Sequence, residues 1–241
     1  MKTLKQERKP AMKAVEERVG NVPEREILLE HIPGMEAAKR VLEVALAGPY
    51  GVVFLYNTNS QAVDLVRAGK RIAGNHGFAF HGLAYPVCPC GHYGSRTTRC
   101  LCKHTAIGRH LMKLGRRQHE FDLWFDACCV RPVGANVESG EPESDIVKRI
   151  LAARQCQAEC IDPDNDAAEF LKQWREHAGA ACDTNRLLKI AGTIAGLDNI
   201  GTTLRPHHVG EAIQYQIQAI SWLYDHTKPQ SVELTNNTIR R

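Results

Sequence analysis

The sequence predicts an α/β domain with a small parallel sheet that carries a cysteine insertion, followed by an all-helical domain. Residues 51–56 read GVVFLY, a continuous β-branched and aromatic run typical of a strand buried on both faces of a parallel sheet. Residues 88–102 read CPCGHYGSRTTRCLC, where two Cys-x-Cys pairs flank a Gly-containing turn. From residue 144 onward, apolar residues recur at helical spacing. A chain of 241 residues is long enough for one large or two small domains.

The first elements follow a charged N-terminal arm, expected over residues 1–31. Residues 34–48, GMEAAKRVLEVALAG, predict a helix, because their apolar residues fall on one face. The segment 61–77, after the first strand, fits two structures. It is a helix if the spacing of Val63, Val66 and Arg67 decides. The hairpin, with residues 68–70 as its tip, is what the family resemblance given below implies. The sequence leaves both open; as a hairpin, it would project Lys70 and Arg71 toward a bound strand or partner.

Two further strands complete the predicted sheet, at residues 78–84 and 121–130. In the second of these, FDLWFDACCV, we expect one face to hold three apolar residues and the other to hold Asp122, Trp124 and Asp126. The two aspartates are interpreted as exposed strand-face residues rather than a catalytic pair. A helix over residues 105–117 is expected to precede this strand, with Ile107, Leu111 and Leu114 inward and its basic residues outward.

The two Cys-x-Cys pairs predict a metal site formed by Cys88, Cys90, Cys100 and Cys102. Four thiolates at this spacing can surround one tetrahedral Zn²⁺, since each short pair bends its backbone around the ion. His92 and His104 flank the pairs and could replace a ligand. The other interpretations are buried free thiols or a remnant site that no longer binds metal. The remaining five of the nine cysteines show no ligand-like pattern.

The charge distribution indicates a basic surface near these cysteines. No Asp or Glu occurs between Asp64 and Glu120, although the net charge of the chain is only +4. A basic block of this kind suits the phosphate backbone of DNA or another nucleic acid. A solvated face, or compensation for a Zn²⁺ held by four thiolates, explains the same pattern. The candidate nucleic-acid-binding residues are Lys70, Arg71, Arg96, Arg99, Lys103, Arg109, Lys113, Arg116 and Arg117.

A phosphate-binding loop is missing where an α/β nucleotide-binding fold would have one. Such a loop needs glycines that let backbone N–H groups approach the phosphates, a Lys for the terminal phosphate and a hydroxyl for Mg²⁺. Residues 56–61, YNTNSQ, contain neither the Gly nor the Lys. We therefore expect no ATP or Mg²⁺ cofactor.

The C-terminal part is expected to be helical over residues 144–225, after a linker at 131–143 that is rich in Gly, Pro and acidic residues. Helices are predicted at 144–159, 162–177 and 185–197, and a long one begins at Arg205-Pro206. The second should bury Phe170 with its other apolar residues. His207 and His208 are interpreted as a capping or surface feature rather than metal ligands. Residues 226–241 are expected to form a flexible tail.

These segments, in this order, resemble the magnesium-chelatase-like AAA+ proteins of the ComM/YifB family over residues 32–217. The resemblance is carried by IPGMEAAKRVLEVALAGPYGVVFL, by CPCGHYGSRTTRCLC and by NRLLKIAGTIAGLD with RPHHVGEAIQYQ. It implies a reduced P-loop NTPase-like (AAA+) sheet over residues 32–130, with a zinc-type cysteine insertion and a helical lid domain. Loss of the family's second and third strands would leave three adjacent strands with the first in the centre. For the family, the resemblance implies ATP hydrolysis and, for ComM, DNA branch migration by a hexamer.

The sequence departs from this family at every group that would hold nucleotide. The Walker A and Walker B residues have no counterparts, and Pro86 stands where the family has its sensor Asn. Glu120 replaces an Arg, and Cys182 aligns with the Arg of the helical domain that would reach the nucleotide, although Arg186 follows one turn later. A non-enzymatic protein is thus expected; any retained activity would be that of an ATPase.

The sequence therefore favours a non-catalytic, zinc-binding scaffold that binds nucleic acid or a protein, such as another copy or an intact AAA+ relative. The alternative is an ATP-binding subunit of a ComM-like DNA-processing ATPase ring. A third possibility is a decaying gene product without selected activity. No run of 18 apolar residues and no N-terminal apolar stretch occurs, so a cytoplasmic location without a membrane partner is expected.

Overall fold

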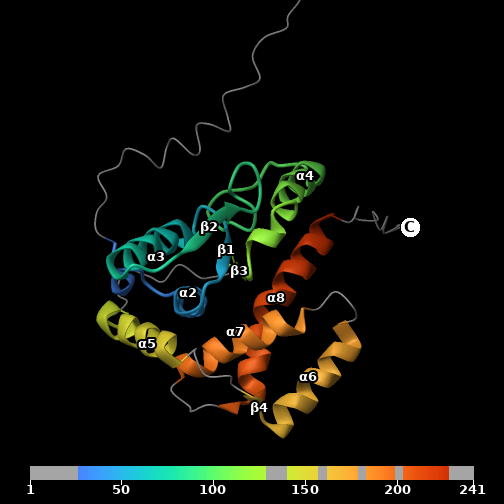
Figure 1. The fold of residues 1–241 in the computed structure, drawn as a ribbon. Helices are drawn as coiled ribbons and strands as arrows, with labels where there is room; N and C mark the ends of the chain where they lie inside the picture. The colour runs from blue at the N-terminus through green and yellow to red at the C-terminus, as the bar shows by residue number, and fades with distance from the viewer. Residues whose placement is uncertain (1–26, 129–139, 157–161, 179–182, 199–202, 228–241) are drawn as a thin grey trace, which may run out of the picture.

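A three-stranded parallel sheet forms the centre of the α/β half of the chain in the computed structural model (Figure 1). Strand β1 (Gly51–Tyr56) lies between β2 (His81–Pro86) and β3 (Leu123–Asp126). The structure describes residues 27–128, 140–156, 162–178, 183–198 and 203–227, and these contain seven α-helices. The prediction of an α/β fold with a small parallel sheet is confirmed, including the central position of the first strand.

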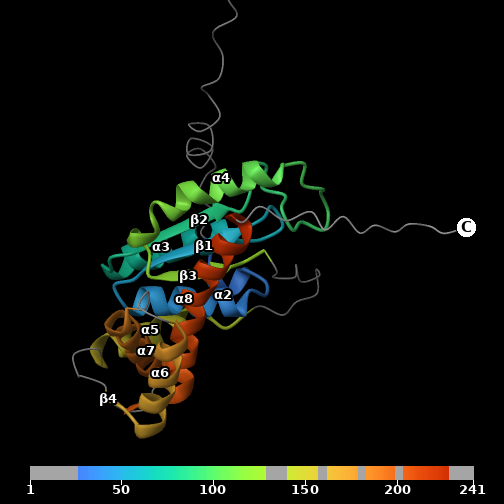
Figure 2. The same ribbon diagram turned by 90° about the vertical axis from the view of Figure 1, so that its right-hand side faces the viewer.

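Helices cover both faces of β1, as its uninterrupted apolar sequence requires. Val52 and Phe54 belong to a large apolar core with α2 (Glu36–Ala47) and α3 (Ala62–His76). The alternate residues Val53 and Leu55 face a second cluster. Leu114 of α4 (His104–Gly115) belongs to that cluster. Figure 2 shows α4 and α2 on opposite sides of the sheet.

The segment 61–77 is helical, so the hairpin interpretation is wrong. Its buried residues recur at helical spacing, and Gly69, expected at a hairpin tip, lies inside α3. A Cβ on Gly69 would lie 2.7 Å from Leu42 Cδ1 and 2.8 Å from Phe80 Cζ. The glycine therefore permits close packing between helices rather than a turn. The helix ends at Gly77, where the Phe78 N–H donates to Ala73 O at 2.8 Å.

The outer strands differ from their predicted bounds. The Phe78 N–H bonds to the last turn of α3, so Phe78 does not belong to the strand. Strand β2 begins at His81 and continues to Pro86, which pairs with Tyr56. In β3 the expected alternation between a buried and an exposed face is wrong: Trp124 is buried, next to the buried Leu123. Trp124 packs edge-on against Phe121 on the α4 side, while Leu123 joins the large core. Residues 129 and 130 lie outside the described part.

Asp122 has a structural role and is not simply an exposed strand-face residue. One carboxylate oxygen accepts the Gly51 N–H at 2.8 Å, which fixes the start of β1 against the start of β3. The other oxygen pairs with the Arg186 guanidinium of α7 (Thr184–Leu197). Arg186 is therefore bound to the amino end of the sheet, away from the carboxyl ends at which α/β folds bind nucleotides.

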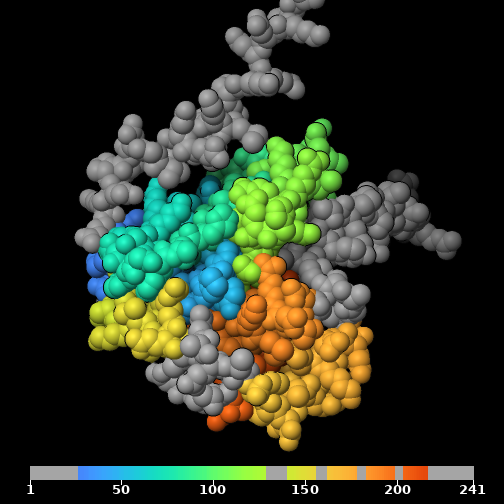
Figure 3. All heavy atoms as spheres, in the orientation of Figure 1, coloured from blue at the N-terminus to red at the C-terminus, as the bar shows by residue number. Residues whose placement is uncertain are grey.

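The C-terminal helices α5 (Glu143–Cys156) and α7 pack on α2, so one apolar core is shared between the two halves of the sequence. On the face shown in Figure 3, both helices lie directly against the α/β half. The last helix, α8 (Pro206–Thr227), contacts α7, β3 and α4. Helix α6 (Asn165–Ala178) lies against α8. Two short parallel strands, β4 (Asp162–Pro163) and β5 (Thr203–Leu204), join the starts of α6 and α8.

Leu29 and Phe170 also differ from their expected burial. Leu29, assigned by sequence to the charged arm, is fully buried in the 3₁₀ turn Leu29–His31, and its N–H donates to the Glu143 carboxylate at 3.0 Å. Phe170, expected in the core, is 38% exposed, because the buried side of α6 is formed by Ala167 and Leu171. A second 3₁₀ turn, Gln118–Glu120, precedes β3.

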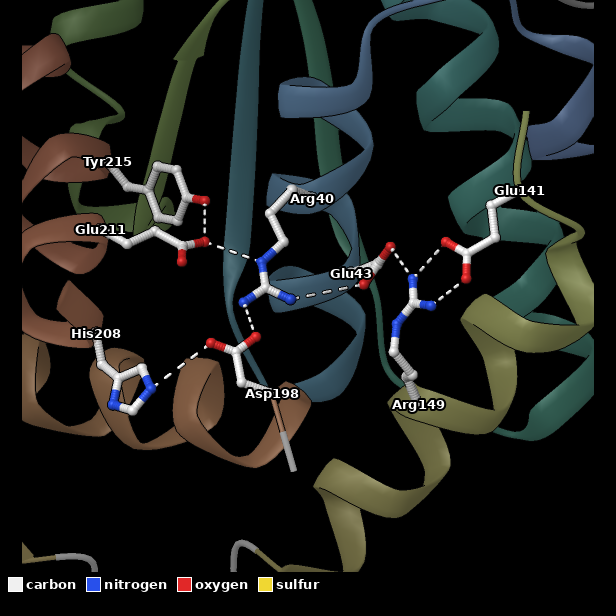
Figure 4. Close-up of polar contacts among 8 residues, drawn as sticks. All are labelled: Arg40, Glu43, Glu141, Arg149, Asp198, His208, Glu211 and Tyr215. Atoms are coloured by element: carbon white, nitrogen blue, oxygen red, sulfur yellow. Dashed lines mark hydrogen bonds and ion pairs between the residues drawn. The ribbon is translucent and has the colours of Figure 1, made fainter. Parts of the chain in front are cut away.

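A network of ion pairs joins α2 to the C-terminal helices (Figure 4). Arg40 of α2 donates to Asp198 at 2.6 Å and to Glu211 at 3.0 Å. Tyr215 donates to the same Glu211 oxygen at 2.6 Å. Glu43, one turn after Arg40, accepts from Arg149 of α5 at 2.9 Å. Burial raises the pKa of the Glu43 carboxyl group, and the Arg149 guanidinium opposes that shift. The network therefore orders three helices around two guanidinium groups.

Candidate metal centre

Four cysteine side chains converge in the segment between β2 and α4. The Sγ atom of Cys88 lies 3.4 Å from that of Cys90 and 3.7 Å from that of Cys100, and Cys90 lies 3.6 Å from Cys100. The Cys102 thiol completes the set, with all four sulfur atoms within 4.8 Å of one another. The sequence-predicted ligands are thus brought together.

These distances fit one tetrahedral metal ion. With a Zn–S bond of about 2.3 Å, the edges of a tetrahedron of sulfurs are about 3.8 Å long. The measured separations lie close to that value, and all four cysteines are free thiols rather than disulfides. A Cys₄ set of soft ligands is typical of structural zinc and of iron–sulfur centres, and it leaves no position open for a substrate. The residues therefore fit zinc in a structural role.

The backbone of the loop is arranged to keep the sulfurs together. Cys88 is fully buried and accepts the Tyr93 N–H on its sulfur at 3.3 Å. The Gly91 N–H donates to Cys88 O at 3.0 Å, and Gly91 has a φ of +77° that most other residues would adopt only with strain. The sequence after the first pair thus turns back sharply and directs the chain toward the second pair.

The four thiols differ in acidity. Desolvation opposes ionisation of Cys90, but the His92 N–H and the neighbouring thiols outweigh it and lower the pKa of Cys90 to about 6. Desolvation raises the pKa of Cys88, Cys100 and Cys102. One thiolate is therefore favoured before the others, and a metal that binds all four must displace protons from the rest.

The flanking histidines do not belong to the cluster. His92 Nδ1 lies 2.9 Å from the hydroxyl of Thr58, in the loop after β1. Neither His92 nor His104 has a ring nitrogen within the group of atoms that could share one ion. The alternative that a histidine replaces one of the cysteines is therefore not supported by the geometry.

The cysteine loop is bound to the segment that follows β1, residues 57–60. The Thr58 N–H donates to Gly91 O at 2.9 Å, and Asn59 exchanges hydrogen bonds with Ser95 and Thr97, both at 3.0 Å. Asn57, 2% exposed, donates to Cys128 O at 3.3 Å. Asn59 thus ties the loop to the carboxyl end of the central strand, and Asn57 joins the ends of β1 and β3; the sequence identified neither as functional. Asn and Thr after a buried strand are the available signal for such side-chain to backbone bonds.

The candidate nucleic-acid-binding residues divide into groups with different surroundings. Lys70 is exposed on α3, in the helix layer across the sheet from α4. Arg71 is held within the fold, because it pairs with Glu143 and donates to Ile27 O. Arg117 pairs with Glu120 at 2.7 Å. The others lie in what we call the cysteine lobe, residues 87–117, with exposed side chains: Arg96, Arg99, Lys103, Arg109, Lys113 and Arg116.

A second group of possible ligands, Asp198, His207 and His208, is better explained as a helix cap. His208 is fully buried at the start of α8, and its Nδ1 accepts the Arg205 N–H at 3.0 Å. The proton of the neutral ring is then on Nε2, which faces an Asp198 oxygen at 3.6 Å. Coordination of a metal through Nε2 would need this proton to leave or to move to Nδ1, and a protonated Nδ1 could no longer accept the Arg205 N–H. The capping interpretation of His208 is confirmed, while a surface position is wrong for it.

A scan against models of known protein families finds no match to the chain, and a search of curated proteins finds none either. None of the helices in the described ranges is both long and apolar enough to cross a membrane. The site must therefore be interpreted from its own geometry.

Proposed function

We propose that this chain is a non-catalytic, zinc-binding protein whose cysteine lobe binds nucleic acid. The observation that carries the proposal is the combination of a compact Cys₄ cluster with exposed cationic side chains on the same loop. Arg96, Arg99 and Lys103 make no ion pair within the described residues, and no carboxylate occurs in their part of the sequence. Cations without internal partners are available to phosphates.

Zinc has a structural role in this proposal. The buried apolar residues specific to the loop and the start of α4 are few: Cys88, Ile107 and Leu111 form a small cluster of their own. A core of that size orders a loop weakly, whereas four thiolates on one ion fix both ends of residues 88–102. The ion thereby holds the basic side chains in a defined arrangement.

The same geometry argues against nucleotide binding. Ligands of open parallel sheets bind at the carboxyl ends of the strands, and a phosphate cradle there needs unpaired backbone N–H groups. The Thr58 and Asn59 N–H groups are already used, by Gly91 O at 2.9 Å and by Asn57 Oδ1 at 3.1 Å. A ring-forming ATPase subunit must hold the phosphates in its own loop, and this loop holds the cysteine lobe instead.

The proposal includes descent from a magnesium-chelatase-like AAA+ protein. The parallel sheet with the first strand in the centre, and the helical C-terminal half packed beside it, are compatible with that origin. Such descent would account for a parallel sheet of the kind that binds nucleotides, in which the loop after the first strand binds the cysteine lobe instead of phosphates. It also provides the alternative role, a subunit that assembles with copies of itself or with an intact relative.

The proposal is tested on the purified full-length chain by elemental analysis and by titration with a fluorescent 30-nucleotide DNA at two salt concentrations. We expect about one zinc per chain, no saturable uptake of ATP·Mg²⁺, and DNA affinity that falls as salt rises. A triple Arg96/Arg99/Lys103→Gln variant should weaken binding and reduce the salt slope for single strands by about two. No DNA binding in low salt would refute the nucleic-acid role, and tight ATP·Mg²⁺ uptake would refute the non-catalytic one.

The matched control is a Lys148/Lys172/Arg175→Gln variant. It removes the same number of exposed cations from α5 and α6, outside the cysteine lobe. It changes the net charge equally, so any general charge effect appears in both variants. We expect the control to retain most of the DNA affinity of the unmodified chain.

A further inference from the structure

Leu101 is an apolar side chain presented to solvent between the last two cysteines of the candidate metal loop. It is 84% exposed, more than any other large apolar residue whose burial the structure describes. Its two neighbours, Cys100 and Cys102, both belong to the sulfur cluster. A metal that holds both neighbours would fix the backbone on either side of Leu101. Little further conformational entropy would then be lost when Leu101 contacts a partner.

Cationic residues flank Leu101. Arg99 and Lys103 are exposed, two residues away on either side, and Arg96 lies on the same loop. An apolar side chain between two cations is complementary to nucleic acid, in which anionic phosphates alternate with bases that have apolar faces. We propose that Leu101 contacts the faces of unstacked bases in single-stranded nucleic acid, while Arg99 and Lys103 bind the adjacent phosphates. This inference depends on the proposed function and specifies its substrate class.

Single strands fit this surface better than a duplex does. The bases of a duplex are stacked, so an apolar wedge reaches their faces only by opening a step. Unstacking one base step costs a free energy comparable to that gained by burying one leucine side chain. Insertion of Leu101 alone into a duplex would therefore give no net gain. In a single strand the base faces are already accessible, and contact with them is tolerant of sequence.

One exposed leucine is also too little for stable attachment to a membrane. Even a whole acyl chain gives only marginal, reversible binding to a bilayer, and Leu101 buries far less apolar area. The other exposed apolar residue of the lobe, Met112, is 53% exposed and lies within α4. Met112 therefore serves as a control for general apolar exposure on the same lobe.

The test measures binding of the full-length protein to a fluorescent 30-nucleotide single-stranded DNA and to its duplex. We expect Leu101→Ala to weaken single-strand binding about tenfold and to change duplex binding less than twofold. Leu101→Trp should tighten single-strand binding, because an indole stacks on bases, and its fluorescence should be quenched in the complex. Met112→Ala should change neither affinity, and all variants should retain the zinc content of the unmodified chain.

The outcomes separate this inference from the proposed function. If Leu101→Ala leaves single-strand affinity unchanged, or weakens duplex binding equally, the role of Leu101 is refuted while nucleic-acid binding stands. If neither DNA is bound in low salt, both are refuted. Leu101-dependent binding to phosphatidylserine vesicles, stronger than to single strands, would show that the surface serves a membrane and would also overturn the inference.

Discussion

The cysteine lobe and the C-terminal helices are ordered by different means. In the lobe, Ile107 and Leu111 form the local apolar cluster with Cys88, which is itself one of the four thiols within 4.8 Å of one another. In the C-terminal half, α5, α7 and α8 contribute to a core that extends through α2 to the sheet, and Arg40 connects α2 to Asp198 and Glu211. The lobe is thus expected to depend on an ion, and the helices on packing and on internal ion pairs.

The two regions also differ in whether their charged side chains stabilise the fold or are available to bind a partner. Several charges of the C-terminal half are bound inside the fold: Arg149 contacts Glu43 of α2, and Arg154 contacts the Leu46 carbonyl near the end of α2. Asp198 and Glu211 bind Arg40 of α2. Arg96, Arg99 and Lys103 of the lobe are exposed and make no ion pair within the described residues, and we expect metal ligands rather than ion pairs to order their loop. A loop ordered by metal ligands would therefore be able to present cations that have no ion-pair partner.

Replacement of a ligand should produce the largest effect, confined to the lobe. Cys88→Ser removes the buried member of the cluster, and structural zinc contributes about 10–16 kcal/mol of apparent binding free energy in small peptides. We expect zinc content to fall from about one to below about 0.1 per chain, and trypsin to cleave at Arg96 and Arg99. Elemental analysis and mass spectrometry of the fragments measure both.

The control for this change is Cys128→Ser, a partly buried cysteine outside the cluster. It should retain zinc and resist trypsin. Full zinc content in the Cys88→Ser variant would mean that the four sulfurs do not share an ion, and the contrast between the two regions would then lose its basis.

Arg40→Met should have the next largest effect, and on the other region. It leaves Asp198 and Glu211 without the cation between them, in a site where Arg40 is only 26% exposed. Removal of one member of a buried ion pair costs about 3–5 kcal/mol, and partial exposure places this case near the lower figure. Urea unfolding followed by circular dichroism should show that loss, with zinc content unchanged.

Lys172→Met provides the comparison, because it breaks an exposed ion pair with Glu169 on α6. We expect its free energy of unfolding to change by less than about 0.5 kcal/mol. If both variants were equally stable, the network of Figure 4 would be incidental to the packing of α2 on the C-terminal helices.

Local features of this architecture could be predicted from sequence, because their cause is local. The apolar run of β1 required cover on both faces, and the spacing of the four cysteines required a turn that brings them together. Helix α4 followed from the period of Ile107, Leu111 and Leu114, all of which are buried. In each case the residues that determine the structure lie within about 15 positions of one another.

Features that depend on distant partners could not be predicted. Arg40 contacts residues more than 150 positions away, and nothing near it in the sequence marks Asp198 or Glu211 as its partners. Arg71 reads as part of a basic block, yet Glu143 binds it from another helix. Gly69 reads as a turn residue, and only the packing of Leu42 and Phe80 against it explains its presence within a helix.

His208 should give the C-terminal half a modest dependence on pH. Burial, and then the neighbouring His207, lower the pKa of His208 below its usual 6.5, with Asp198 and Glu211 opposing the shift. Below pH 6.5 the unfolded chain therefore binds a proton that the folded chain does not, and the free energy of unfolding falls as the pH is lowered. The slope is at most about 1.4 kcal/mol per pH unit, and it ends where folded His208 is protonated.

The measurement is urea unfolding between pH 8 and pH 5. His208→Asn keeps a side-chain oxygen that can accept the Arg205 N–H but removes the titrating group. The slope of the free energy of unfolding against pH should therefore decrease, by at most about 1.4 kcal/mol per pH unit, the value for one proton. An unaltered slope in His208→Asn would show that His208 is equally protonated in the folded and unfolded chains.

The smallest expected effect concerns one cation of the cysteine lobe. It tests whether such cations contribute to phosphate binding rather than to the stability of the fold. Lys103 is exposed and has no ion pair within the described residues, so Lys103→Gln should leave the free energy of unfolding and the zinc content unchanged. If Lys103 binds one phosphate, the variant should bind single-stranded DNA about threefold more weakly, with a salt slope smaller by about 0.7. Lys70→Gln, which changes another exposed lysine, on α3, should alter neither quantity. Equal losses in both variants would mean that binding follows the net charge of the whole protein, so the lobe would not be the binding surface.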